Sequence, residues 1–202
     1  MFRFAIDHGL GGAKHNPATD TKLADVWLPR TKDNYARIDA REAPKLLRKT
    51  ERYQGTPTTR LAMKLIALTF VRTGELINAR WSKFELDAGR WDIPAERMKM
   101  KAPHVVPLST RAMDVLTVLH GITGHSALLF PGERDHEKPM SNDTILGALN
   151  RMGYQGRMTG HGFRGVASTV LHEQGFDHQH IELQLAHTER HVVSAVSPAD
   201  VN

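Results

Sequence analysis

The segment that runs from Leu61 to Val71 constrains the fold of this 202-residue chain more than any other. Its apolar residues recur at helical spacing on nearly every side, so the helix it forms must be surrounded by other elements and lie in the core. Thr58 or Thr59 is expected to cap this helix, and Gly74 is expected to interrupt it. A chain of this length is sufficient to surround such a helix with one sizeable core.

Three extended runs follow this helix and predict a small antiparallel sheet. Runs 84–86 and 90–94 flank the turn-like tripeptide 87–89, and the third run covers 104–108. Helical periodicity surrounds them on both sides. The predicted fold is therefore mainly α with a small antiparallel β-sheet (α+β). Its remaining helices are expected at 43–53, 75–80, 110–120, 141–152, 162–174 and 178–186.

The first part of the chain has a different character. A short helix is broken by Gly9, Gly11 and Gly12, and the stretch after it contains Asn16-Pro17 and Pro29, which prevent a second helix from starting. We predict that residues 1–38 form an interdomain connector and that residues 39–202 form a helical domain.

Composition narrows the class of protein. Hydrophobic residues make up 40% and charged residues 24%, as in ordinary soluble domains, and the net charge of +5 is compatible with a polyanionic partner. The chain has no cysteine, which excludes disulfides, thiolate metal ligands and a cysteine nucleophile. It shows no signal-peptide pattern and no run near the roughly 20 apolar residues that span a bilayer. We expect a soluble cytoplasmic protein without a membrane partner.

Four short motifs carry cationic or proton-transferring side chains in a fixed order. The first is Arg72-Thr73-Gly74-Glu75-Leu76, and the second places Lys99 ahead of the segment 103–109. The third is His161-Gly162-Phe163-Arg164, and the fourth is Leu185-Ala186-His187. Guanidinium groups bind phosphate oxygens through a planar fork, and fixed cations stabilise the charge that a phosphodiester gains during attack. Such a set is suited to binding a phosphate group.

In this order the motifs resemble the active site of the tyrosine recombinases, the phage-integrase family. The residues of these motifs are most similar to those of integrases from satellite phages and genomic islands. The match runs from the connector at Asn16-Pro17 to His187. The resemblance implies the catalytic-domain fold of that family, duplex DNA as partner and no cofactor. It also implies that Glu75 supports the first arginine. The residues that it places in the catalytic site are Arg72, Lys99, His161, Arg164 and His187.

The resemblance also assigns a role to each type of side chain. The two arginines clamp the scissile phosphate, and the two histidines donate hydrogen bonds or move a proton. The lysine protonates the departing 5′-oxygen. Lys101 is the second candidate for this lysine, and the spacing to the Val-Pro-Leu element at 106–108 favours Lys99.

The nucleophilic tyrosine of the family has no counterpart in the sequence. It would fall at Val196 or Ser197, and the tyrosines of the chain are Tyr35, Tyr53 and Tyr154, all far upstream. A serine is a much weaker acid than a phenol and would be a poor substitute. We therefore interpret residues 39–202 as an integrase catalytic domain with a truncated C-terminus, which binds DNA without forming a phosphotyrosine.

The same truncation bears on assembly. Family members pair on DNA through their C-terminal segment, so with an intact C-terminus this chain would be expected to pair with other recombinase protomers on DNA. The 202-residue chain itself is expected to be a monomer when alone.

Three alternative interpretations stay open. One is a DNA-binding or regulatory relic of an integrase that no longer needs chemistry, and another is a pure interaction protein. The third is a metal-dependent nuclease that uses some of the twelve histidines, such as His187 with His191 or His178 with His180. The chain lacks a His-Glu-x-x-His motif, so we expect no metal.

Each motif also has an ordinary structural interpretation. Arg72 could be a cation at the carboxyl end of the preceding helix. His161 and Arg164 could belong to an ordinary capped helix start, and Lys99 could be a solvated hairpin charge.

Overall fold

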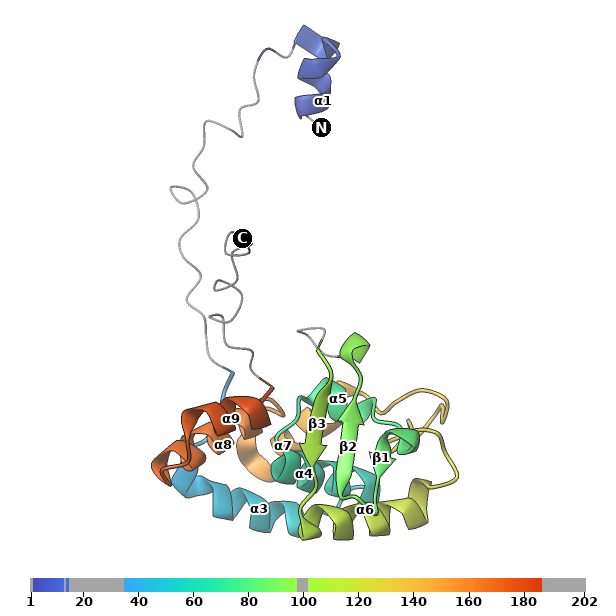
Figure 1. The fold of residues 1–202 in the computed structure, drawn as a ribbon, viewed down its shortest axis with the longest axis vertical. Helices are drawn as coiled ribbons and strands as arrows, with labels where there is room; N and C mark the ends of the chain where they lie inside the picture. The colour runs from blue at the N-terminus through green and yellow to red at the C-terminus, as the bar shows by residue number, and fades with distance from the viewer. Residues whose placement is uncertain (1, 13, 15–34, 98–101, 187–202) are drawn as a thin grey trace, which may run out of the picture. The chain divides into compact units, whose positions relative to one another are not determined.

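The computed structural model describes residues 2–12, 14, 35–97 and 102–186, which form two units, Met1–Asn34 and Tyr35–Asn202. The first unit contains helix α1 (Phe2–Asp7) and a 3-10 turn at Leu10–Gly12 (Figure 1). Gly9, Gly11 and Gly12 all have positive φ, which confirms the predicted break after the first helix. The boundary at residue 38 stays a prediction.

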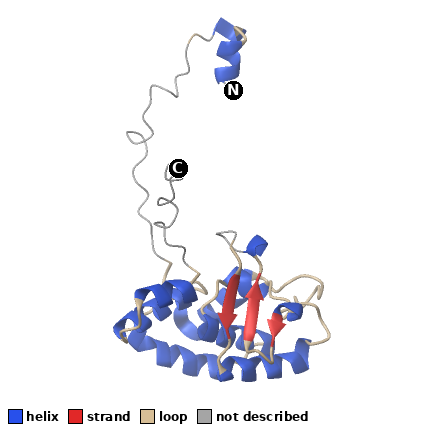
Figure 2. Cartoon of the chain, viewed as in Figure 1, coloured by secondary structure: helices blue, strands red, loops and turns tan. Residues whose placement is uncertain are grey.

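The second unit is mainly helical and contains one small sheet, as predicted (Figure 2). Short 3-10 turns occur at Ala40–Glu42, Trp81–Lys83 and Ala95–Arg97, and a π-helical turn at Asn150–Tyr154 extends α7. The strands of the second unit are β1 (Phe84–Glu85), β2 (Arg90–Ile93) and β3 (His104–Pro107). Its helices are α3 (Ala43–Glu51), α4 (Pro57–Thr69), α5 (Thr73–Ile77), α6 (Thr110–Thr123), α7 (Asn142–Leu149), α8 (Gly162–Glu173) and α9 (His178–Gln184).

The sheet is antiparallel, with strand order β1-β2-β3. Trp91 in the middle strand lies opposite Phe84 on one side and Val106 on the other. Trp91 and Val106 are buried, and the Phe84 ring stacks on the Trp91 ring with centroids 4.9 Å apart. Gly89 has a φ of 59°, which confirms the predicted turn between β1 and β2. Because successive side chains along β2 and β3 point to opposite faces of the sheet, one of these faces packs into the core.

Helix α4 lies at the centre of the core, as its apolar sequence predicted. It packs against α3, α6 and α7, and Met63, Leu65 and Ile66 are completely buried. An amphipathic helix would bury one stripe only, whereas α4 is covered from several directions. Its carboxyl end leads directly to the first arginine motif.

Both ends of α4 differ from the sequence-based prediction. Thr56 caps the helix by accepting a hydrogen bond from the Thr59 amide, because Pro57 occupies the first helical turn, where its missing N–H leaves no donor unsatisfied. The helix stops at Thr69, because Phe70 adopts a left-handed conformation with a φ of 56°. Gly74, predicted to interrupt α4, lies inside α5. The left-handed residue is bulky, so local sequence did not indicate a stop there.

Two other helix ends are closed by residue types that commonly close helices. Ser141 caps α7 through a hydrogen bond from the Asp143 amide to the Ser141 hydroxyl. Gly175 follows α8 with a φ of 79°, the left-handed conformation that glycine adopts most readily after a helix. Among the described residues, no helix combines the length and apolar character needed to cross a bilayer.

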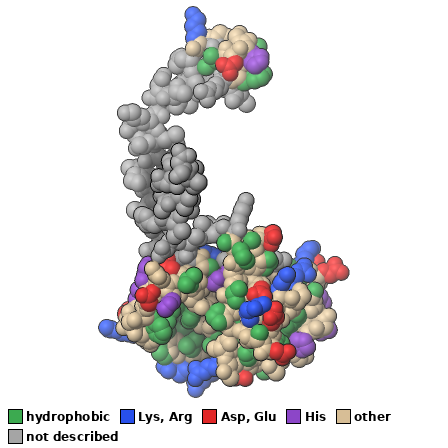
Figure 3. Space-filling view, viewed as in Figure 1, with side chains coloured by type: hydrophobic (Ala, Val, Ile, Leu, Met, Phe, Trp, Pro, Cys, Tyr) green, Lys and Arg blue, Asp and Glu red, His purple; other side chains and the backbone are tan. Residues whose placement is uncertain are grey.

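Charged groups are spread over the surface of the second unit. Acidic and basic side chains are interspersed on the face shown in Figure 3, and Lys and Arg side chains gather near its lower edge. Helix α3, which runs along that edge in Figure 1, carries exposed Lys45, Arg48 and Lys49. These exposed cations are not among the residues predicted to carry the chemistry, so they offer control positions for experiments on them.

Candidate functional site

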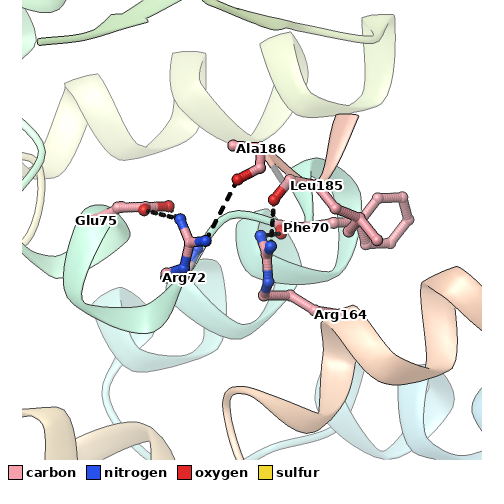
Figure 4. Close-up of polar contacts among 6 residues, drawn as sticks. All are labelled: Phe70, Arg72, Glu75, Arg164, Leu185 and Ala186. Carbon is pink, nitrogen blue, oxygen red and sulfur yellow. Dashed lines mark hydrogen bonds and ion pairs between the residues drawn. The ribbon is translucent and has the colours of Figure 1, made fainter. Parts of the chain in front are cut away.

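Arg72 and Glu75 form one unit at the start of α5. The Arg72 amide donates to Glu75 Oε2 at 2.8 Å, and Arg72 Nη1 donates to Glu75 Oε1 at 2.7 Å (Figure 4). The Glu75 side chain is 5% exposed and that of Arg72 is 22% exposed. One carboxylate therefore caps the helix and fixes the direction of the guanidinium, which keeps access to the surface.

Arg164 projects from α8 and is almost fully buried, with 3% of the residue exposed. Its Nη1 donates to the Phe70 carbonyl at 2.6 Å, and its Nη2 donates to the Leu185 carbonyl (Figure 4). The left-handed conformation of Phe70 is what presents that carbonyl beyond the end of α4. Arg164 thus connects three helices, since it joins α8 to the carboxyl ends of α4 and α9.

The two guanidinium groups lie close enough to influence each other. Burial and then the neighbouring Arg72 charge lower the pKa of Arg164 to about 10, while Glu75 and Glu182 act in the opposite direction. A pKa near 10 leaves Arg164 charged at neutral pH. The site therefore contains two positive charges around one buried carboxylate, an electrostatic environment that favours an anion.

The last residue of α9 and the residues that follow it complete this site. Arg72 Nη2 donates to the Ala186 carbonyl at 3.4 Å, and Gln184 Nε2 donates to the Thr69 carbonyl at 3.2 Å. Ala186 has a φ of 48°, in the left-handed region that alanine seldom adopts. The chain that leaves α9 is thus tied both to α4 and to the Arg72 guanidinium.

His104, the first residue of β3, belongs to the same site and was not predicted from the sequence. Burial lowers its pKa from the usual 6.5, as do the charges of Arg164 and Arg72. Glu75 and a hydrogen bond to the Gln184 backbone raise it. Strand alternation could have indicated this position, because His104 lies two residues before the buried Val106 and on the same face of the strand.

His161 stands at the start of α8, one turn before Arg164. Its side chain does not cap the helix; the Gly162 amide donates to the Thr159 hydroxyl at 3.0 Å instead. The His161 ring packs against the Tyr35 ring, with centroids 4.4 Å apart. The Thr159 hydroxyl, and not the His161 side chain, therefore caps the start of α8.

Three of the six predicted residues are brought together directly, namely Arg72, Glu75 and Arg164. Arg72 pairs with Glu75 at the start of α5, whereas Arg164 contacts the Phe70 carbonyl at the end of α4. Lys99 and His187 lie outside the described residues, as do Lys101, Val196 and Ser197.

The described residues contain no group of three or more His, Cys, Asp or Glu able to hold a metal ion.

Comparison with known proteins shows the class to which this fold and site belong. The chain matches the phage integrase family over residues 36–195, and it is a member of that family. It is 42% identical to the integrase of Enterobacteria phage P4 over 96% of this chain and 47% of that protein. It is 39% identical to the prophage integrase IntZ of Escherichia coli K12 over 94% of this chain and 46% of that protein. The chain spans about half the length of these relatives.

Solved structures share its fold at lower identity. A lambda integrase dimer bound to a COC′ core site has a TM-score of 0.67 and 22% identity, over 94% of this chain and 53% of that one. XerA recombinase has a TM-score of 0.62 and 20% identity, over 76% of this chain and 56% of that one. The resemblance to the tyrosine recombinases and the predicted catalytic-domain fold are thereby confirmed.

The burial of Arg164 predicts a large effect of a conservative change. Arg164→Lys retains a charge but cannot reach two carbonyl groups with a planar fork, so at least one buried carbonyl loses its donor. We expect the free energy of unfolding to fall by about 1–3 kcal/mol. Urea unfolding followed by circular dichroism measures it. Arg157→Lys, at a side chain that is 55% exposed, is the control and should cost less than about 1 kcal/mol. An equal loss in both variants would contradict the role given to Arg164.

The lowered pKa of His104 predicts a dependence of stability on pH. Below pH 6.5 the unfolded chain takes up a proton at His104 before the folded chain does, so acidification favours unfolding. The His104→Gln variant cannot take up this proton. Its free energy of unfolding should therefore fall less than that of wild type between pH 7.5 and 5.5. Urea unfolding at the two pH values tests this, with the exposed His136→Gln as control. Identical losses in wild type and His104→Gln would refute the prediction.

Proposed function

We propose that this chain binds the phosphate backbone of duplex DNA at the strand-transfer site of a site-specific integrase. The observation that carries the proposal is the cluster of Arg72 and Arg164 around the buried carboxylate of Glu75. A carboxylate that both caps a helix and orients a guanidinium leaves that guanidinium ready to bind an anion. The proposed place of action is the cytoplasm, where attachment-site DNA is accessible.

The two arginines are proposed to act differently. Arg72 keeps an exposed fraction of 22% and donates at a long 3.4 Å to Ala186, so a phosphate oxygen can compete for this guanidinium. Arg164 is buried, and its terminal nitrogens are engaged by the Phe70 and Leu185 carbonyls. We assign direct phosphate contact to Arg72, and to Arg164 the supporting charge and the arrangement of the surrounding backbone.

The remaining predicted residues complete the reaction of the family. His161 and His187 are proposed to donate hydrogen bonds to the phosphate, and Lys99 to protonate the departing 5′-oxygen. In the complete reaction a tyrosine hydroxyl attacks phosphorus, the bond to the 5′-oxygen breaks, and a 3′-phosphotyrosyl link forms. Preorganised cations stabilise the negative charge that develops during this exchange.

DNA as the partner is supported by what the structural neighbours bind. The lambda integrase neighbour is bound to a COC′ core site, and a Tn1549 transposon integrase with a TM-score of 0.63 is in complex with circular intermediate DNA. For this chain we propose duplex DNA of the attachment-site type. We further propose that the chain is a monomer when it is alone and that residues 39–202 act as its catalytic domain.

Val196 and Ser197 stand at the positions where the tyrosine of the family would fall, and this favours DNA binding without covalent chemistry. A DNA-binding or regulatory protein derived from an integrase requires the phosphate clamp and has no need of the nucleophile. That is the pattern of this sequence, so we propose binding without phosphotyrosine formation as the activity of the 202-residue chain.

The DNA contact of Arg72 is tested by substitution. Arg72→Ala should weaken binding to a fluorescein-labelled duplex about tenfold and lower the slope of log K against log salt by about one, because one phosphate contact is lost. Fluorescence anisotropy at several salt concentrations measures both quantities. Arg48→Ala, at an exposed position on α3, is the matched control and should change affinity less than twofold. If the two variants bind alike, the proposed contact is wrong.

The absence of covalent chemistry is tested with a nicked duplex that traps a phosphotyrosine. No protein–DNA adduct is expected in denaturing gels, whereas the phage P4 integrase run in parallel serves as the positive control. EDTA should leave binding unchanged. An adduct would contradict the proposal, and cleavage that EDTA abolishes would favour the metal-dependent nuclease.

A further inference from the structure

A tyrosine ring packs against the imidazole of His161 at the start of α8. The ring belongs to Tyr35, the first residue of the second unit, and its centroid lies 4.4 Å from that of His161, with 46° between the ring planes. Tyr35 is 64% exposed, and His161 is partly buried. The two rings therefore meet at the surface of the unit, where the imidazole remains accessible.

The chain continues from this ring as residues 35–37, here called the entry segment, which is held on the same end of α8. The Thr159 hydroxyl, which caps α8, also donates to the Ala36 carbonyl at 3.4 Å. Arg37 Nη1 donates to the Gly165 carbonyl at 3.1 Å. Each residue of the entry segment thus has its own contact at the start of α8.

Two glycines of α8 allow the entry segment to lie this close. A Cβ atom at Gly162 would lie 2.7 Å from the Ala36 carbonyl oxygen, and one at Gly165 would lie 2.7 Å from Arg37 Cδ. Both distances are well below the roughly 3.5 Å of ordinary contact between non-bonded atoms. Glycine normally weakens a helix, so its use here is explained by the close approach of the entry segment. This approach determines where the Tyr35 ring stands relative to His161.

We infer that Tyr35 is a positioning residue of the strand-transfer site, which holds the His161 imidazole in one orientation. The inference rests on the proposed function, in which His161 donates a hydrogen bond to the phosphate. Aromatic rings at this separation attract each other, and their contact restricts rotation of the imidazole. A donor that is already oriented loses less conformational freedom when its ligand binds.

Tyr35 lies in the stretch predicted as a connector and outside the four motifs, so no motif indicates it. An exposed aromatic ring can also stack on a nucleic-acid base. The contact that the structure contains is with His161, and for that reason we assign to Tyr35 an action through this histidine. The two roles differ in what the loss of Tyr35 does when the histidine is already absent.

A double-mutant cycle on the full chain separates the two roles. Tyr35→Ala should weaken binding to the fluorescein-labelled duplex about threefold, because an oriented donor is lost, and Tyr35→Phe should restore the affinity, because the ring is retained. In a His161→Ala background, Tyr35→Ala should have no further effect. Phe176→Ala, which removes an exposed aromatic ring beyond the other end of α8, is the control and should change affinity less than 1.5-fold.

Three results of this cycle would overturn the inference. Equal weakening by Tyr35→Ala in both backgrounds would show that Tyr35 contacts the DNA by itself. Wild-type affinity of Tyr35→Ala would show that the ring contact is without consequence for binding. Failure of Tyr35→Phe to restore affinity would show that the aromatic ring is not the group that acts.

NMR of the DNA-free chain measures the orientation of His161 directly. Three-bond couplings across χ1 of His161 should report one rotamer in wild type and in Tyr35→Phe, and an average over rotamers in Tyr35→Ala. A nuclear Overhauser effect between the Tyr35 and His161 ring protons is expected in wild type. Couplings that Tyr35→Ala leaves unchanged would contradict the positioning role.

The two measurements distinguish this inference from the proposed function. If wild type binds no DNA, the proposed function fails, while the couplings of His161 still decide whether Tyr35 orients the imidazole. If wild type binds DNA and the cycle shows no coupling between Tyr35 and His161, the positioning role alone is refuted.

Discussion

The arrangement of the whole site depends on the buried guanidinium of Arg164. Its two terminal nitrogens donate to the Phe70 carbonyl at the end of α4 and the Leu185 carbonyl at the end of α9. A buried charge is costly unless hydrogen bonds compensate for its lost hydration, so the folds of both helix ends are coupled to this side chain. Arg72 follows Phe70 by two residues and His187 follows Leu185 by two. The same interaction therefore governs the approach of the chain to both motifs.

Charge balance explains why this arrangement is suited to an anion. Glu75 neutralises one guanidinium by direct contact, and the second guanidinium remains charged despite its burial. The lowered pKa of His104 favours its uncharged ring, so His104 adds no third positive charge beside the two guanidinium groups. A phosphate diester carries one negative charge, and in partly buried surroundings its attraction to the guanidinium groups is only weakly screened by salt. The proposed function follows from the placement of these two guanidinium groups rather than from the modest net charge of the chain.

Sequence patterns predicted the elements well and the ends of α4 poorly. The apolar run at 61–71 placed α4 in the core, and the three extended runs gave the antiparallel sheet, because periodicity reports which faces are buried. Phe70 stops α4 in a conformation that its own side chain disfavours, and the compensating Arg164 contact lies far away along the chain. Local propensity contains no information about such a contact.

For the candidate site too, the sequence motifs predicted which residues take part but not how they are arranged. The motifs identified Arg72, Glu75 and Arg164, which the fold brings together, but they gave no sign that Arg164 binds backbone carbonyls. His104 was missed because its closeness to the two arginines depends on how the chain folds, although its spacing from the buried Val106 already pointed it inward. Motifs record which groups serve the chemistry, whereas the contacts that position them depend on tertiary packing.

The measurement that tests this account most directly is NMR of the arginine guanidinium groups during titration with a short duplex. The account predicts that the Nη signals of Arg72 shift as DNA binds, while those of Arg164 shift less because its terminal nitrogens stay on the Phe70 and Leu185 carbonyls. Exposed Arg48 on α3 provides the reference for non-specific effects. Saturable DNA binding with Arg72 signals that do not move, or that move no more than those of Arg48, would contradict the account.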